Sequence, residues 1–216
     1  MRMLVTGANR GIGRELAAGG VARGWQVWGT ARSGNVPDGV QPIVADVTDR
    51  AALDRAAAGI PSLDILINNA GISGPIPPRA TDLSADDLIE VLRVNTAGPL
   101  MVAQAFLPAL RASGRGRILN ISSQMSCMGY RKPDQPAYRT SKAALNKLMQ
   151  CLATDLEPEG IPVVLIDPGW VRTDMGGAEA SEDPAAVARG ILDIAAALGP
   201  ADTGRFIRFD GTDRPF

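Results

Sequence analysis

Hydrophobic and polar positions along the chain repeat with two alternating periods. Short apolar runs, typical of buried strands, alternate with segments whose apolar residues recur as on one face of a helix. Strands are predicted over residues 1–7, 25–32, 40–47, 63–71, 116–123, 161–169 and 204–211. Helices are predicted over residues 12–23, 49–58, 84–113 with an interruption at 95–99, 137–157 and 183–198.

Strands that alternate with helices through short loops predict a parallel sheet covered on both faces. The run LDILINNAG is almost continuously apolar, as expected of a strand buried on both sides. Right-handed crossovers then give a doubly wound, Rossmann-like α/β fold of about seven strands. The sequence shows no internal boundary or repeat, so we expect a single domain over residues 1–216. Ligands should bind at the carboxyl ends of the strands.

The composition limits the possible functions. The net charge of −1 gives no excess of positive charge that would attract nucleic acid or an anionic membrane, so we expect neither as a partner. No apolar run approaches the roughly 18 residues of a membrane helix, and the first residues resemble a strand, not a signal peptide. With two cysteines and no disulfide framework, a cytoplasmic location is the expectation. The chain has no histidine, which excludes Ser-His-Asp catalysis and His-based metal sites, so no metal is expected.

A glycine-rich segment, TGANRGIG, follows the first predicted strand and precedes the first helix. In this position Gly7, Gly11 and Gly13 let backbone N–H groups approach a pyrophosphate at the positive end of the helix. The spacing differs from the G-x-G-x-x-G form, and a plain structural turn is the alternative. The strand before the segment and the helix after it favour a dinucleotide site.

The end of the second strand distinguishes between cofactors. Enzymes that bind an unphosphorylated ribose place an acidic residue about 20 residues after the glycines. Here Ala31 and Arg32 occupy that region, and Arg10 lies inside the glycine segment. Guanidinium groups suit a 2′-phosphate, so we expect NADP(H) as the cofactor and regard NAD(H) as the less favoured alternative. Solvated surface charges are the competing interpretation for both arginines.

Polar residues also follow the third and fourth strands. Asp46 could accept a hydrogen bond from an adenine amino group, although helix capping explains it equally well. Asn68 and Asn69 can bond both backbone and ligand, while Ala70 and Gly71 leave room for a flat cofactor. Two adjacent asparagines after a buried strand could also form only a turn.

The segment AYRTSKAALNKLM places Tyr138 and Lys142 four residues apart on one helix face. Hydroxyls of Ser122 and Ser123, at the end of the preceding strand, should reach the same crevice. A phenol has a pKa of about 10, and a neighbouring ammonium group favours the phenolate form. We therefore expect Lys142 to lower the pKa of Tyr138 toward the working pH. A serine hydroxyl and an acidic phenol can then polarise and protonate a carbonyl oxygen while hydride arrives at carbon. The alternative is an aromatic and a cation that merely share a helix face.

Six motifs in order carry a family resemblance: TGANRGIG, NNAG, VNTAGP, NISS, YRTSK and DPGWVRTDM. With them the chain resembles the short-chain dehydrogenases/reductases over essentially its whole length. YRTSKAALN and the ending TGRFIRFDGTDRPF look most like the carbonyl-reductase-like branch, which includes C-factor-type proteins.

The resemblance implies catalytic roles. Tyr138 would donate the proton, Ser123 would hold the substrate oxygen, and Asn95 would hold a water for proton relay. Lys142 would bind the nicotinamide ribose and lower the Tyr138 pKa. Taken with the arguments above, the expected cofactor-binding residues are Gly7, Asn9, Arg10, Gly11, Ile12, Gly13, Arg32, Asp46, Val47, Asn69, Ala70, Gly71, Tyr138, Lys142, Pro168, Gly169, Val171 and Thr173.

The chain departs from the family pattern in the spacing of its serines and in being shorter than many relatives. Family members often place the active serine thirteen residues before the tyrosine, and here that position is Met125. Ser123 is favoured because it continues the strand, with Ser126 as the alternative. The short segment 170–183 leaves little material for a substrate lid. A shallow pocket is expected, bordered by Met125, Met128, Tyr130, Trp170 and Met175, although core packing is an equally good interpretation.

The leading functional hypothesis is an NADPH-dependent oxidoreductase that reduces the carbonyl of a small aldehyde or ketone, or runs in reverse. The alternative is a dinucleotide-binding regulatory or signalling protein with little turnover. A nucleotide-sugar epimerase is disfavoured, because such enzymes add a substantial C-terminal substrate region. The resemblance also suggests a homodimer through the helix that carries Tyr138, although an Ala-rich helix can equally pack within its own core.

Overall fold

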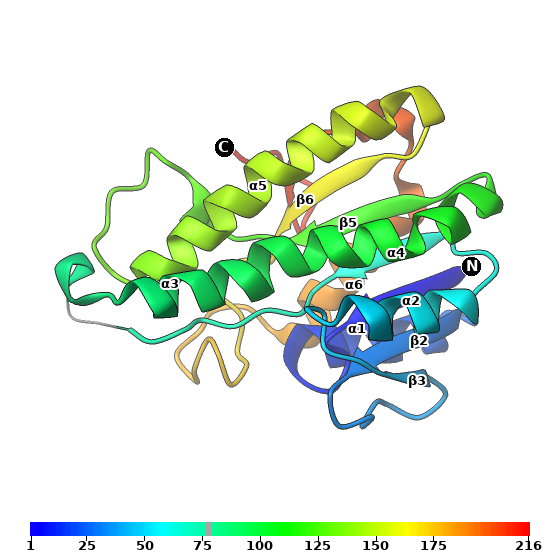
Figure 1. Ribbon diagram of the computed structural model, residues 1–216, viewed down its shortest axis with the longest axis horizontal. Helices are drawn as coiled ribbons and strands as arrows, with labels where there is room; N and C mark the ends of the chain where they lie inside the picture. Colours follow the sequence, from blue (N-terminus) through cyan, green and yellow to red (C-terminus); the bar gives the residue numbers. More distant parts are fainter. Residues whose placement is uncertain (77–78) are drawn as a thin grey trace.

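Seven parallel strands form one sheet in the computed structural model, which describes residues 1–76 and 79–216 (Figure 1). Their order across the sheet is β3-β2-β1-β4-β5-β6-β7. The strands are β1 (Arg2–Thr6), β2 (Gln26–Ala31), β3 (Gln41–Val44), β4 (Ile65–Asn68), β5 (Arg117–Ile121), β6 (Val163–Asp167) and β7 (Phe206–Arg208). The predicted doubly wound α/β fold is confirmed, with strands that end one to several residues inside the predicted ranges.

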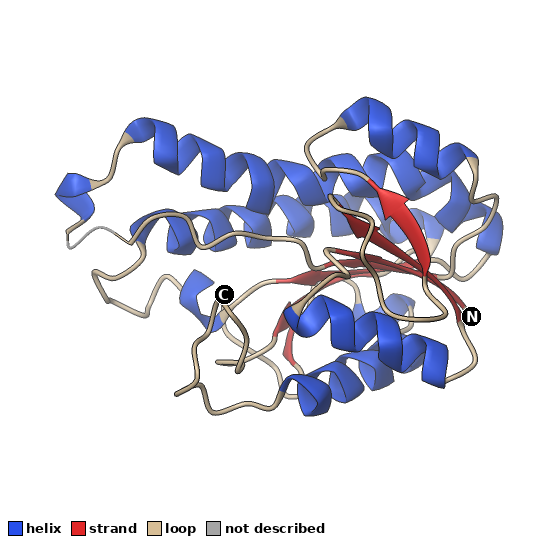
Figure 2. Ribbon diagram, turned by 90° about the horizontal axis from the view of Figure 1, so that it is seen from below, coloured by secondary structure: helices blue, strands red, loops and turns tan. Residues whose placement is uncertain are grey.

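Helices cover both faces of the sheet, as the view along its plane in Figure 2 shows. The helices are α1 (Gly11–Ala22), α2 (Arg50–Ala58), α3 (Ala85–Leu92), α4 (Gly98–Ser113), α5 (Pro136–Leu156) and α6 (Pro184–Ala197). Helices α1 and α6 pack together over one face, and α2, α4 and α5 cover the other. Each face has its own apolar core, which explains why β4, β5 and β6 are buried along their whole length. Among the described residues, no helix is long and apolar enough to cross a membrane.

The direction in which the chain adds strands to the sheet changes beside β1. The chain first builds β2 and β3 on one side of β1, and then places β4 on its other side. The carboxyl ends of β1 and β4 therefore open onto a crevice, the place where open α/β sheets bind ligands. The glycine segment follows β1 and the segment Asn69–Gly71 follows β4, so the fold brings these two predicted motifs together.

The long helical segment after residue 84 contains the predicted interruption, in the form of a π-turn over Arg93–Ala97. Gly98 donates its N–H to the carbonyl of Arg93, five residues earlier, instead of four. Pro99 has no N–H to donate to the carbonyl of Asn95. The helix therefore continues, but its hydrogen-bond pattern changes at Asn95. Such π-turns occur frequently at functional sites.

The opposite, amino-terminal edge of the sheet carries a buried charge cluster. Asp64 precedes β4 and its side chain is fully buried. Its carboxylate accepts from the backbone N–H of Arg2 at 2.7 Å, and its side chain pairs with the guanidinium groups of Arg2 at 2.9 Å and Arg115 at 3.2 Å. The carboxylate therefore ties the start of β1 to the segment that enters β5.

Candidate active site

The glycine segment adopts a turn that side chains would block. Gly11 has a φ of +53°, in the region that favours glycine. A Cβ on Gly13 would lie 2.2 Å from the carbonyl oxygen of Gly7, so only glycine fits. The amide of Asn69 donates to the carbonyl of Thr6 at 2.9 Å and thereby fixes the turn from the neighbouring strand end. The segment therefore forms a rigid loop against the end of β4.

Helix α1 begins in this loop without a side-chain cap. Arg10 precedes the helix and makes no capping hydrogen bond, and the first turn contains no acidic residue. Helices α2, α3 and α6 are each capped by a side chain, from Asp49, Ser84 and Asp183 respectively, whereas α4 and α5, like α1, have no side-chain cap. An uncapped amino terminus leaves backbone donors and the positive end of the helix dipole for an anion. This feature of the structure fits a pyrophosphate. Beside the glycines, Asn9 is exposed and Ile12 packs against the core.

Both arginines expected to meet a 2′-phosphate are solvent-exposed at this edge of the sheet. Arg10 forms a long, exposed ion pair with Asp174 at 3.2 Å, which leaves it free to rearrange. Arg32 follows β2 and lies close enough to Asp46 to lower the pKa of that carboxyl group.

Asp46 turns partly inward at the end of the third strand region. Its Oδ1 accepts from the backbone N–H of Thr48 at 2.9 Å and from the hydroxyl of Thr48 at 2.7 Å. Burial raises the pKa of Asp46, but these bonds together with Arg32 and Arg93 outweigh it and leave the pKa below its ordinary value. Both bonds use Oδ1, so within the described part of the chain Oδ2 remains to accept from a ligand. The side chain of Val47 is buried in the core, so only its backbone can border a ligand.

Asn95 is fully buried and all of its side-chain groups bond within the protein. Its Oδ1 accepts from the N–H of Ile72 at 2.9 Å, and its Nδ2 donates to the carbonyl of Ile72 at 2.8 Å and to Ser141 at 3.0 Å. A Cβ on Gly71 would lie 3.1 Å from Asn95 Oδ1 and 3.8 Å from Lys142 Nζ. Asn95 therefore joins the segment after β4 to helix α5, next to the predicted catalytic lysine.

Tyr138 and Lys142 lie side by side on α5, as predicted, with Lys142 Nζ 5.6 Å from the centre of the Tyr138 ring. Lys142 is buried, and its Nζ donates to the backbone carbonyl of Ile121 at 2.7 Å. Burial lowers the pKa of Lys142 to about 8. The ammonium is therefore held by the end of β5 beneath the phenol.

The expected lowering of the Tyr138 pKa is wrong in this structure. Burial raises the pKa of Tyr138 to about 12, and a hydrogen bond with Ser123 lowers it by less than burial raises it. The negative charge of Asp167 adds to the increase. The physical reason is that Lys142 donates to a carbonyl oxygen and not to the phenol, so desolvation decides the outcome.

The two candidate serines have different surroundings. The hydroxyl of Ser123 contacts the Tyr138 phenol and accepts from the N–H of Met125 at 3.1 Å. The hydroxyl of Ser126 donates to the carbonyl of Ser123 at 2.6 Å and accepts from the amide of Asn146 at 2.8 Å. Ser126 therefore supports the loop, and Ser123 faces the phenol.

The segment after β6 also lies against the glycine loop. Pro168 is buried, Val171 is buried and forms a bridge with Glu182, and Gly169 has a φ of +74°. A Cβ on Gly11 would lie 3.3 Å from Cγ2 of Thr173. The structure therefore places the DPGWVRTDM motif directly against the glycine loop, as a site for one extended ligand requires.

The apolar side chains expected to border a pocket lie mostly at the protein surface. Met128, Tyr130, Trp170 and Met175 are all exposed, and Met125 is half-buried. A separate hollow of about 400 Å³ lies near the start of β6, between the far end of α5 and Thr203. That hollow is at the amino-terminal edge of the sheet, away from Tyr138. We place the candidate active site at the carboxyl edge, where Tyr138 and the uncapped start of α1 lie.

Two supporting residues escaped sequence reasoning. Asn146 accepts from Ser122 at 2.5 Å and donates to Ser126, so it holds the serine loop from α5. Its position four residues after Lys142, on the same helix face, was an available signal. Asp167 ends β6 and is fully buried, and the sequence gives no sign of its partners.

Comparisons with known proteins identify the family of the chain. The family model for short chain dehydrogenases matches residues 1–184. The protein C-signal of Myxococcus xanthus is 40% identical over 155 residues, which cover 71% of this chain and 93% of that protein.

Solved structures are also similar. The carbonyl reductase Sniffer of D. melanogaster superposes with a TM-score of 0.92 at 30% identity, covering 100% of this chain and 99% of that one. The NADPH-bound carbonyl reductase from chicken fatty liver superposes with a TM-score of 0.91 at 30% identity, covering 100% of this chain and 98% of that one. The chain therefore belongs to the short-chain dehydrogenase/reductase family of oxidoreductases, in its carbonyl-reductase-like branch.

Proposed function

We propose that the protein is an NADPH-dependent reductase that converts a small aldehyde or ketone to the alcohol, or catalyses the reverse reaction. The observation that carries the proposal is the meeting of Ser123, Tyr138 and Lys142 at the carboxyl edge of the sheet. The uncapped start of α1 opens onto the same edge. A proton donor and an anion site in one crevice suit transfer of hydride and a proton to a carbonyl group.

The residues present fit a phosphorylated dinucleotide. The glycine loop and the start of α1 would hold the pyrophosphate, while Arg32 and Arg10 would meet the 2′-phosphate. Asp46 would accept from the adenine, and the segments at Asn69 and Thr173 would flank the middle of the ligand. When bound, NADPH supplies the hydride for carbonyl reduction. The NADPH in the similar chicken carbonyl reductase supports this assignment.

The pKa values support Tyr138 as a proton donor. A pKa of about 12 keeps the phenol protonated at neutral pH. An alkoxide is far more basic than a phenolate, so even this phenol can protonate the oxygen of a reduced carbonyl group. The Ser123 hydroxyl would donate a second hydrogen bond to the same oxygen and stabilise the developing charge.

Lys142 would hold the cofactor ribose and place a positive charge below the phenol. With a pKa of about 8, the ammonium remains predominantly charged at pH 7. The carbonyl of Asn95 has lost its usual helical donor at Pro99, so it could hold a water molecule for proton relay. The side chain of Asn95 has a different role, since it already bonds to Ile72 and Ser141.

The border of the crevice supports a small, apolar carbonyl substrate. Met128, Trp170 and Met175 are exposed and would border it, and only residues 168–183 lie between β6 and α6. A short segment leaves little chain to enclose a large substrate.

Consumption of NADPH tests the proposal directly. The purified protein is assayed with a panel of aldehydes, ketones, quinones and pteridines, and Tyr138→Phe serves as the paired variant. We expect turnover with at least one carbonyl compound, and a loss of about 10²–10⁴-fold in Tyr138→Phe, the usual contribution of general acid catalysis. Equal turnover by the variant would contradict the role of Tyr138.

A regulatory function is the second candidate, because the relative at 40% identity carries the name C-signal. Under that hypothesis the protein binds NADPH but converts none of the carbonyl compounds. The retained contact between Ser123 and the Tyr138 phenol favours catalysis, since a dinucleotide sensor does not need a proton donor.

A further inference from the structure

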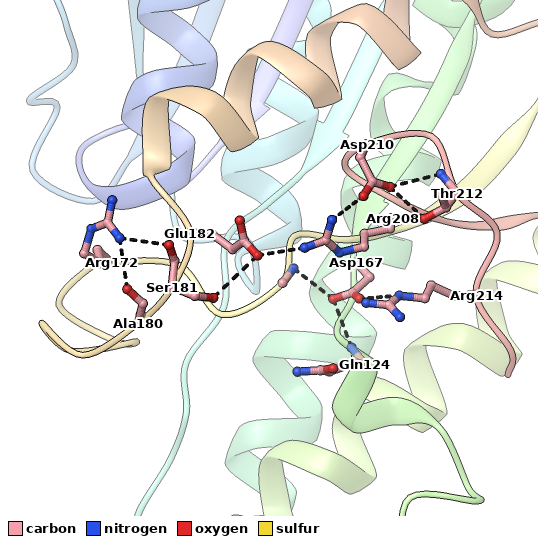
Figure 3. Close-up of polar contacts among 11 residues, drawn as sticks. Gln124, Asp167, Arg172, Ala180, Ser181, Glu182, Arg208, Asp210, Thr212 and Arg214 are labelled. Atoms are coloured by element: carbon pink, nitrogen blue, oxygen red, sulfur yellow. Dashed lines mark hydrogen bonds and ion pairs between the residues drawn. The ribbon is translucent and has the colours of Figure 1, made fainter.

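The last residue of β6, Asp167, connects three parts of the protein (Figure 3). Its Oδ1 accepts from the N–H of Gln124 at 3.1 Å and from the N–H of Gly169 at 3.0 Å. Its Oδ2 accepts from Nε of Arg214 at 2.8 Å. The carboxylate is fully buried, so all three contacts are formed inside the protein. Asp167 therefore holds the turn that follows Ser123 and the turn that carries the DPG motif.

The segment after β7 contacts the serine loop at a second point. Cys127 lies in that loop, and its thiol donates to the backbone carbonyl of Phe216 at 3.6 Å. The ring of Phe216 lies 5.7 Å from the ring of Phe206, and Arg214 donates its N–H to the carbonyl of Phe206 at 2.8 Å. The segment 212–216 therefore runs back along β7 and ends under the candidate active site.

A second ion pair joins the same region to the segment between β6 and α6. Arg208, the last residue of β7, pairs with Glu182 at 2.7 Å. A Cβ on Gly169 would lie 3.0 Å from Cγ of Glu182, so the pair packs against the DPG turn. Figure 3 shows Glu182 and Arg208 beside Asp167 and Arg214. Both turns that flank the reacting centre are thus supported from the C-terminal side.

We propose that Asp167 and Arg214 form a positioning pair for the active site. Neither residue needs to touch substrate or cofactor. The pair fixes the backbone next to Ser123 and at Gly169, and the arginine balances a buried negative charge that faces the phenol. This inference rests on the proposed function for its catalytic meaning, but its electrostatic part concerns Tyr138 alone.

The charges of the pair should shift the pKa of Tyr138 in a direction that can be measured. Burial is the largest cause of the raised pKa of Tyr138, and the charge of Asp167 raises it further. Removal of the Asp167 charge should therefore lower the pKa of Tyr138, and removal of the Arg214 charge should raise it. Opposite shifts in the two variants would show that the pair acts on Tyr138 through its charges, and the effect on turnover tests the positioning role. The other charged groups are Lys142, which lies against the Tyr138 ring, and Arg208, Glu182 and Asp210, which lie beside the pair (Figure 3).

The chain offers a direct readout, because Tyr130 and Tyr138 are its two tyrosines. In a Tyr130→Phe background, the absorbance of tyrosinate measures the ionisation of Tyr138 alone. Rapid pH jumps allow this absorbance to be recorded before the protein unfolds. Relative to this background, we expect Arg214→Met to raise the apparent pKa by roughly half to one unit, and Asp167→Asn to lower it by a similar amount. Arg214→Lys should restore most of the original value.

The matched control is the other buried Asp–Arg pair of the sheet. Arg115→Met should leave the Tyr138 titration unchanged, because Asp64 and Arg115 lie at the opposite edge. Shifts of the same sign in Arg214→Met and Asp167→Asn, or no shift in either, would overturn the proposal. If Asp167→Asn fails to fold, the comparison of Arg214→Met with Arg214→Lys still decides, since Arg214 is only partly buried.

Turnover provides a second readout. With a carbonyl substrate from the panel, we expect Arg214→Met to reduce kcat at least fivefold while the KM for NADPH changes less than twofold. An unchanged kcat together with the opposite pKa shifts would remove the positioning role and keep the electrostatic one. If the wild-type protein converts no carbonyl compound, the proposed function fails, and the titration still tests the pair.

Discussion

Two buried aspartates at opposite edges of one sheet have similar chemistry and different consequences. Asp64 and Asp167 both have fully buried side chains, and both pair with an arginine from a distant part of the chain. Asp64 bonds to two arginines and to the backbone of Arg2. Asp167 bonds to one arginine and to two backbone N–H groups beside the candidate active site.

The difference lies in what each carboxylate holds. Asp64 fixes the start of β1 and the segment that enters β5, at the edge of the sheet where no ligand is expected. Asp167 fixes two irregular turns at the carboxyl edge, where backbone that is not held by a strand or helix must face a ligand. The same interaction therefore stabilises the fold at one edge and orders reactive groups at the other. The predictions below compare the two edges: the first tests the charge of Asp64, and the later ones test charges at the carboxyl edge.

The largest effect on stability is expected at the amino-terminal edge. Asp64→Asn should lower the free energy of unfolding by about 3 kcal/mol, because Arg2, Arg115 and the buried Arg117 lose their shared counter-charge. Turnover per folded molecule should not change. Denaturant unfolding at neutral pH, together with the carbonyl assay, measures both quantities.

The pH dependence of this variant provides its control. Hydrogen bonds from Arg2 and Arg115 hold the pKa of Asp64 well below its ordinary value, despite the opposing effect of burial. The stability due to this group is therefore present above the ordinary carboxyl pKa and is lost as the pH falls below it. The difference in the free energy of unfolding between wild type and Asp64→Asn should become smaller below about pH 4. A constant difference down to pH 2 would contradict the assignment.

At the carboxyl edge, Lys142 should reduce the stability of the protein without cofactor. Its pKa of about 8 lies below the ordinary 10.5, so at neutral pH the folded state carries a buried charge. This cost disappears as the pH rises from about 8 to 10.5. Between pH 7 and pH 10, the free energy of unfolding of the wild-type protein should rise by about 2–3 kcal/mol relative to that of Lys142→Met. Lys147→Met, on the exposed side of the same helix, is the matched variant and should show no such change.

The smallest effect concerns cofactor choice. Arg32→Asp places a carboxylate where a 2′-phosphate would bind, and we expect the preference for NADPH over NADH to fall on the order of tenfold or more. Fluorescence titration with both cofactors measures the ratio. Arg55→Asp on α2 makes the same charge change at another exposed site and should leave the ratio unchanged. The same loss in both variants would indicate a general charge effect.

The order of elements could be read from the sequence because period and turn signals are local properties. The glycine loop, Tyr138, Lys142 and Ser123 could be proposed as site residues because each lies at a predicted strand end or on a predicted helix face. Asp167 and Arg214 were missed because their contact joins residues 47 positions apart in the chain. The Tyr138 pKa was predicted with the wrong sign, since the sequence does not show that Lys142 donates to Ile121.

The support of the serine loop was also invisible in the sequence. The spacing between Ser123 and Tyr138 suggested only that a loop of altered length lies between strand and helix. The structure shows how this loop is held, through Asn146 and Ser126 on one side and Gln124 on the other. Such contacts depend on side-chain directions after packing, which no local pattern contains.

The central claim is that Tyr138 completes a hydride transfer to a carbonyl compound at the carboxyl edge of the sheet. Transfer of deuterium from NADPH that carries deuterium at both C4 positions of the nicotinamide, detected in the alcohol product by mass spectrometry, tests it most directly. We expect labelled alcohol from the wild-type protein, and a loss of labelling in Tyr138→Phe although the variant still binds NADPH. Labelled product in equal amount from Tyr138→Phe, or bound NADPH without any labelled product from wild type, would contradict the claim.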